Sequence, residues 1–141
     1  MLDGGAAGGI KGYFSGATNA MIAIYSGPQP LSADTGATGT LLGTVSVDAD
    51  GVTGLTFDAA VAGTISKAAA ETWRFTGLAD GTAGWFRFYA PGDTITNVST
   101  TAARLDGSIG TSGAELNLTN LAITTGQVNT CDAFSITQPA S

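Results

Sequence analysis

The chain contains a series of short apolar runs, closed by Gly, Pro or Asp-Gly every 8–15 residues, and this series strongly limits the folds available to it. Within the clearest runs, 40–47, 72–76 and 82–89, apolar and polar residues alternate with the period of two that is typical of a strand with one buried face. No amphipathic segment of roughly 10–15 residues lies between the runs, so a parallel α/β fold is excluded. The pattern predicts an antiparallel all-β protein.

About eight short strands with regular turn signals favour a single antiparallel β-sandwich or jelly-roll-like domain. We expect this domain to span residues 19–141. Asp80-Gly81 and Asp106-Gly107 are predicted turns, because Asp-Gly pairs favour tight hairpin connections. The only helix candidate is a single turn at 67–71.

Strand alternation also predicts which side chains face inward. In 40–47, Leu41 is expected to face inward and Leu42 outward, while in 82–89 Phe86 and Phe88 share one face and Trp85 and Arg87 the other. The predicted core is Ile22, Ile24, Leu41, Val45, Val47, Phe57, Trp73, Phe75, Phe86, Phe88, Leu105, Phe134 and Ile136.

The composition narrows the possible partners. Gly, Ala, Thr and Ser account for 75 of 141 residues, only 16 residues are charged, and the net charge is −6. Nucleic acid is an unfavourable partner, because few cations are available to neutralise phosphates. No apolar run reaches the roughly 18 residues of a membrane-spanning helix, so we expect no membrane partner.

The side chains available for catalysis are few. Without His, the chain can form neither a Ser-His-Asp triad nor a typical zinc site, and no phosphate-binding glycine loop is present. Asp48 and Asp50 resemble a calcium loop only faintly, and Ala59 stands where its final Glu belongs. The single Cys131 is expected to be a small buried residue and not a reactive thiol. We therefore expect a protein that is not an enzyme and that needs no metal or cofactor.

An aromatic cluster allows two interpretations. Trp73, Trp85, Phe86, Phe88 and Tyr89 are expected to form the core, although at an exposed site such rings could stack on sugars. Binding of carbohydrate by a β-sandwich module is therefore an alternative function.

Residues 1–18 form a separate glycine-rich arm, with six glycines and three spaced apolar anchors, Ile10, Tyr13 and Phe14. Such a segment is either a frayed terminus or an arm that becomes ordered on a neighbouring subunit. Ile10, Tyr13 and Phe14 are the candidate partner-binding residues. The arm shows neither the basic region nor the apolar stretch of a signal peptide, so we expect synthesis and folding in a cytoplasm.

The chain resembles small structural proteins of tailed bacteriophages over residues 20–140. The resemblance rests on turn and strand motifs, namely IYSGPQPLSAD at 24–34, TGTLLGTV at 38–45, WFRFY at 85–89, DGSIG at 106–110, LNL at 116–118 and FSITQP at 134–139.

The resemblance implies a component of the phage particle that is assembled in the host cytoplasm and ends in the virion. The role expected first is a head decoration (cement) protein, a homotrimer that binds the major capsid protein and stabilises the capsid lattice. A tail, baseplate or fibre-associated role is the alternative. Small side chains suit either role, because little rotamer entropy is lost when large surfaces are buried.

Overall fold

The computed structural model describes residues 21–50, 55, 64–89, 94–100 and 104–137, and within these ranges it contains strands, turns and no helix. The nine strands of this part of the chain are β1 (Met21–Ser26), β2 (Leu41–Val47), β3 (Thr64–Ser66), β4 (Trp73–Thr76), β5 (Gly81–Tyr89), β6 (Arg104–Gly110), β7 (Leu116–Leu118), β8 (Ala122–Ile123) and β9 (Val128–Thr137). The expected all-β class is therefore confirmed.

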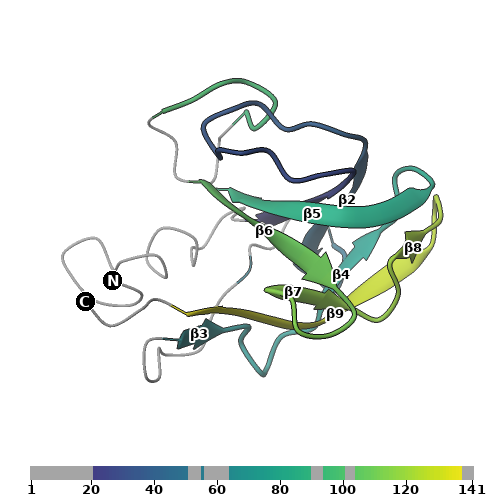
Figure 1. Cartoon of the computed structure of the whole chain (residues 1–141). Coiled ribbons are helices and arrows are strands. Elements are labelled where there is room, and N and C mark those ends of the chain that lie inside the picture. The colour runs from purple at the N-terminus through teal and green to yellow at the C-terminus, as the bar shows by residue number, and fades with distance from the viewer. Residues whose placement is uncertain (1–20, 51–54, 56–63, 90–93, 101–103, 138–141) are drawn as a thin grey trace.

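The strands form one sheet that closes on itself (Figure 1). Seven strands follow the order β1-β2-β4-β9-β7-β6-β5, and pairing of β5 with β1 completes the barrel. β8 pairs with the first residues of β5, and β3 pairs with the last residues of β9. The pair β6–β7 is parallel, whereas the other pairs are antiparallel. The expected sandwich or jelly roll is thus not confirmed, and the described sheet is a barrel.

Strand β1 lies between β2 and β5. A bulge in the pairing of β1 with β2 determines which leucine of β2 enters the core. Ile24 pairs with Gly43 whereas Tyr25 pairs with Leu41, so Leu42 is the extra residue. A bulge of this kind reverses the inward and outward alternation on its far side. Leu42 is consequently fully buried and Leu41 is 36% exposed, the reverse of the expectation from strict alternation.

The barrel interior is built around Phe134. Its ring contacts Trp73 at 5.5 Å, Phe86 at 5.5 Å and Phe88 at 5.8 Å between centroids. The remaining predicted core residues that are fully buried are Ile22, Ile24, Val45 and Phe75, and Val47 and Leu105 pack against them. Leu41 is the incorrect member of the predicted core. Phe57 and the side chain of Ile136 lie outside the described part of the chain.

Asp106 and Gly107 are not a turn. They lie within β6, where Asp106 pairs with Arg87 and Gly107 pairs with Phe86 across the ladder. A Cβ at position 107 would lie 2.5 Å from the Phe86 ring, so glycine is required there for packing and not for a turn. The helix candidate at 67–71 is not a helix. Residues 68–71 form a β-turn in which the Glu71 N–H donates to the Ala68 carbonyl at 3.0 Å, and the Lys67 N–H donates to the Phe134 carbonyl of β9 at 3.0 Å.

Candidate functional site

The outer face of β1 and β5 carries a second apolar cluster, separate from the barrel interior. Ala23, Tyr25 and Trp85 are buried there, and the Tyr25 and Trp85 rings are stacked with centroids 4.9 Å apart. Burial raises the pKa of the Tyr25 phenol, and the positive charge of Arg87 opposes this shift. Residues 85–88 of β5 are buried on both faces of the strand, whereas Thr82 and Gly84 near its start are exposed.

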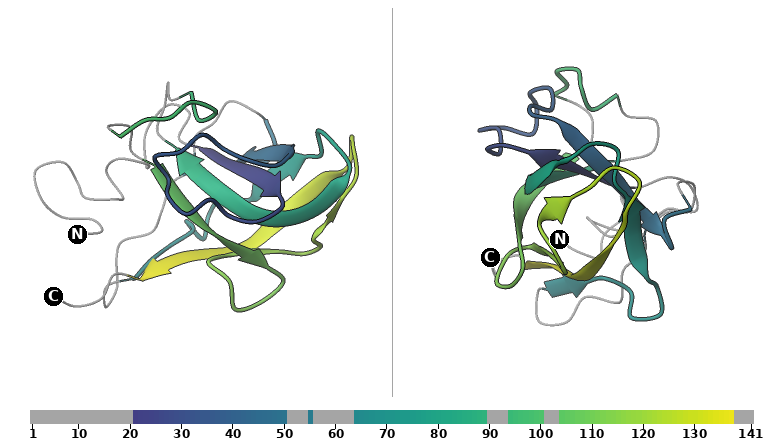
Figure 2. Two further views of the ribbon diagram at one scale, coloured as in Figure 1. Left: turned by 45° about the horizontal axis from the view of Figure 1, so that its top comes forward. Right: turned by 90° about the vertical axis from the view of Figure 1, so that its right-hand side faces the viewer.

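Two connecting segments, 27–40 and 94–100, run side by side next to this cluster; we call them the loop pair (Figure 1). Ala37 and Ile95, one from each segment, pack on the cluster. The Ala37 N–H donates to the Ile95 carbonyl at 3.0 Å, and the Ser99 N–H donates to the Asp34 carbonyl at 2.8 Å. Figure 2 shows the same adjacency from two further directions.

Arg87 fixes the inner side of the loop pair. Its side chain is 0% exposed and donates from Nε and Nη2 to the two carboxylate oxygens of Asp106, at 2.6 and 2.8 Å. Its Nη1 donates to the Thr35 carbonyl at 2.7 Å and to the Ile95 carbonyl at 3.1 Å, which joins the two segments. The guanidinium carbon also lies 5.3 Å from the Trp85 ring centroid, within the range of a cation–π interaction.

Arg104 holds the same segments from a second position. Its Nη1 donates to the carbonyls of Asn97 at 2.9 Å and Ala33 at 3.2 Å, with a longer contact to Thr35 at 3.5 Å. Its Nη2 donates to the Thr94 carbonyl at 3.1 Å. The two arginines therefore donate to loop carbonyls that would otherwise need water as a partner. These hydrogen bonds hold one segment against the other.

The loop pair presents apolar side chains to solvent. Leu31 on one segment is 107% exposed, and Val98 on the other is 74% exposed. The carbonyls of Ala33 and Asn97 accept from the same Arg104 nitrogen. Leu31 is two residues from Ala33 and Val98 is next to Asn97, so both exposed side chains stand close to backbone that Arg104 holds. Two aliphatic side chains on fixed backbone are suited to docking, because little backbone entropy remains to be lost.

The residues predicted to bind partners or ions have varied outcomes. Ile10, Tyr13 and Phe14 lie outside the described part of the chain. Asp48 forms an exposed ion pair with Arg74 at 3.5 Å. Among the residues that the structure describes, no group of three potential metal ligands is found.

Four of the five aromatic residues and Cys131 are buried. Trp73, Trp85, Phe86 and Phe88 are fully buried, and Tyr89 is half-buried. In this arrangement the four buried rings offer no face on which a sugar could stack. Cys131 is 1% exposed, and burial raises the pKa of its thiol far above the usual range, which disfavours the nucleophilic thiolate.

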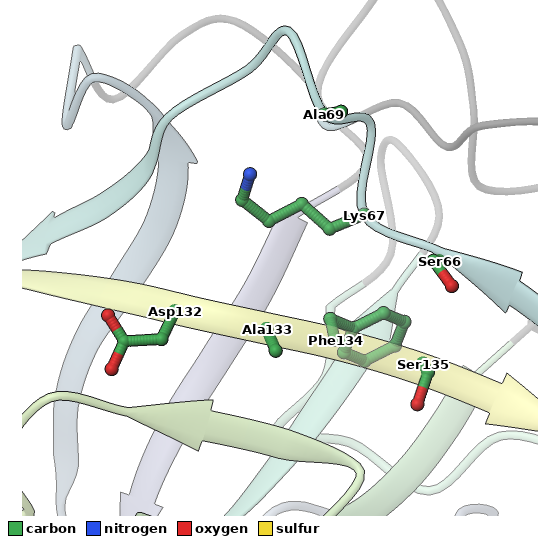
Figure 3. A pocket seen from close by; sticks show the side chains of 7 residues that line it. All are labelled: Ser66, Lys67, Ala69, Asp132, Ala133, Phe134 and Ser135. Carbon is green, nitrogen blue, oxygen red and sulfur yellow. The ribbon is translucent and has the colours of Figure 1, made fainter.

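One cavity of about 290 Å³ lies between β9 and the segment that joins β3 to β4 (Figure 3). Lys67 and Asp132 line this cavity. The Lys67 ammonium group donates to the carbonyls of Glu71 at 2.5 Å and Ala68 at 3.3 Å. The Asp132 carboxylate accepts from the Thr119 hydroxyl at 2.9 Å. The charged groups of the cavity are thus bound to the chain itself.

Sequence reasoning did not identify Arg87, Arg104 and Asp106 as the residues that organise the site. A signal was available, since Arg87 stands between apolar residues on a strand in a chain with only five cations. A buried cation in such a position needs a carboxylate partner.

Comparison of the chain with protein-family models, with curated proteins and with solved structures found no match. The described residues include no helix with the length and apolar character to cross a membrane.

Proposed function

We propose that this protein is a structural component of a tailed-bacteriophage particle, and specifically a head decoration protein that binds the major capsid protein and stabilises the lattice as a symmetric oligomer. The proposal combines the sequence resemblance with one structural observation, the arginine-fixed loop pair that presents Leu31 and Val98. The loop pair is the proposed capsid-binding surface.

The physical properties of the loop pair suit this role. Arg87 and Arg104 hold both segments in place before binding, so the cost of ordering them is met during folding. A few apolar contacts from each copy give weak binding, and many copies on a symmetric lattice turn weak binding into high avidity. The acidic net charge of −6 keeps free subunits soluble before assembly.

The N-terminal residues Ile10, Tyr13 and Phe14 are a second proposed contact, with an adjacent decoration or capsid subunit. Deletion of residues 1–18 should then leave a folded protein that binds heads more weakly and stabilises them less against heat.

The test of the loop pair uses purified phage heads that lack this protein, with binding measured by co-sedimentation. The double variant Leu31→Ser/Val98→Thr should lower the apparent affinity at least tenfold and leave the melting temperature of the free protein unchanged, because both side chains are exposed. Ala69→Ser is the control, since Ala69 is also exposed and lies in the turn between β3 and β4, away from the loop pair.

Equal head binding by the wild type and the double variant would refute the loop pair as the capsid-binding surface. Failure of the wild type to bind heads, together with its presence in isolated tails, would replace the head role with a tail, baseplate or fibre-associated role.

A further inference from the structure

Three exposed large apolar residues outside the loop pair lie on neighbouring elements at one end of the barrel. Leu41 is 36% exposed, Leu78 is 56% exposed and Val128 is 54% exposed. They belong to β2, to the turn after β4 and to β9, which are neighbours in the sheet. Together with Leu31 and Val98 of the loop pair, they complete the set of exposed large hydrophobic residues in the described part of the chain.

Backbone pairing brings these three residues together. The Leu78 N–H donates to the Leu42 carbonyl at 2.9 Å, which places Leu78 beside the start of β2. Val128 pairs with Thr76, and the Gly77 N–H donates to the Gln127 carbonyl at 2.8 Å, so the pairing of β4 with the β9 segment continues to the turn that carries Leu78. We call Leu41, Leu78 and Val128 the barrel-end patch.

The turns that carry the patch are tied to each other. Gly77 and Gly126 are joined through the Gly126 N–H, which donates to the Gly77 carbonyl at 2.8 Å. Asp80 accepts from the backbone N–H of Thr125 at 2.8 Å and from its hydroxyl at 3.0 Å. The right panel of Figure 2 looks onto this end, with the β4–β5 and β8–β9 connections toward the viewer. The patch is therefore held on connected turns.

The turns and strand ends that carry the patch contain few charged residues. The nearest cation on β4 is Arg74, two residues before Thr76, and it forms an ion pair with Asp48. Segments 40–42, 76–82 and 122–128 contain one charged residue, Asp80, and its carboxylate is bound by Thr125. The exposed neighbours are threonines and a glutamine, namely Thr40, Thr76, Thr82, Thr124, Thr125 and Gln127. The rest of the chain carries nearly all of the net charge of −6.

We propose that the barrel-end patch is the surface through which copies of this chain associate. Two chains of charge −6 repel each other over most of their surfaces, and a neutral apolar end is where they approach without that cost. A basic partner would instead bind the carboxylate-bearing surfaces elsewhere on the chain, and not this patch. The inference rests on the proposed function insofar as decoration requires a symmetric oligomer, and it names the surface that forms the oligomer.

The location at a barrel end suits cyclic symmetry. Copies related by a rotation axis close to Leu78 bring equivalent leucines together, and the loop pairs remain free to face a lattice. In Figure 1 the loop pair is at the top and the β4–β5 and β8–β9 connections are at the right.

The test measures the oligomeric state of the full chain by sedimentation velocity over a wide concentration range. The wild type should show concentration-dependent association, and Leu78→Ser/Val128→Thr should raise the dissociation constant at least tenfold. The control is Leu31→Ser/Val98→Thr, which removes the same side-chain types from the loop pair and should leave association unchanged. A wild type that stays monomeric throughout, or association that both double variants weaken equally, would overturn the inference.

A crosslinking measurement provides an independent check. With Leu78→Cys, a mild thiol oxidant should produce disulfide-linked dimers, whereas Thr111→Cys at another exposed position should not. The native Cys131 is 1% exposed and does not interfere. Equal crosslinking at both positions would contradict the proposed contact. Loss of association in Leu78→Ser/Val128→Thr, without head binding by the wild type, would refute the decoration role and leave this inference intact.

Discussion

Replacement of Asp106 by Asn tests whether the buried ion pair holds the loop pair. Asp106 and Arg87 have side chains 5% and 0% exposed, with Arg87 Nε 2.6 Å from Asp106 Oδ1. Asn keeps the shape and one acceptor but removes the negative charge. The Arg87 guanidinium is then left buried without a counter-ion, between the Trp85 ring and the loop carbonyls.

The expected loss is about 3–5 kcal/mol of unfolding free energy, the usual cost of removing one partner from a buried ion pair. Domains of this kind are stable by only about 5–15 kcal/mol, so the variant should lose a large share of its stability. The matched control is Asp48→Asn, because Asp48 forms an ion pair with Arg74 whose side chains are 65% and 44% exposed. Solvent screening limits that exposed pair to about 0–1 kcal/mol.

The assay is urea unfolding of both variants and the wild type, followed by tryptophan fluorescence and circular dichroism. Trp85 lies in the outer cluster and Trp73 in the barrel interior, so Trp73→Phe and Trp85→Phe backgrounds separate the two layers. If Asp106→Asn costs no more than Asp48→Asn, the ion pair contributes nothing beyond a surface contact and our account of the loop pair is wrong.

Three further predictions concern the barrel and its turns. Phe134→Ala should cost about 3–5 kcal/mol in urea unfolding, because it empties the centre of the aromatic core, and wild-type-like unfolding would contradict that packing. Ala49→Gly should raise the unfolding free energy by up to about 1 kcal/mol, because Ala49 has a φ of 60°; Ala122→Gly in β8, the control, should lower it. Hydrogen bonds from Thr125 lower the pKa of Asp80, so the contribution of this carboxylate to stability is present near neutral pH and is lost as pH falls through the lowered pKa. The difference in Tm between the wild type and Asp80→Asn should therefore shrink as pH is lowered. A Tm difference that does not change with pH would refute this prediction.

The fold class, most strand positions and the two faces of β5 could be predicted from the sequence. These follow from local features, since alternation and turn residues act over a few neighbouring positions. The strand predicted at 82–89 matches β5 (Gly81–Tyr89), with Phe86 and Phe88 on one face and Trp85 on the other. Cys131 was likewise correctly expected to be buried.

The closure into a barrel, the parallel pairing of β6 with β7 and the organisation of the loop pair depend on contacts between residues far apart in the sequence. Alternation gives each strand two faces but does not say which strand is its neighbour, and a bulge moved Leu42 inward in place of Leu41. Asp106 is bound by Arg87, 19 residues away, and Ala33 is bound by Arg104, 71 residues away. Local sequence favours a turn at Asp106-Gly107, but the buried charge of Arg87 requires a carboxylate and Phe86 requires a neighbour without a side chain, so these long-range contacts place both residues in a strand.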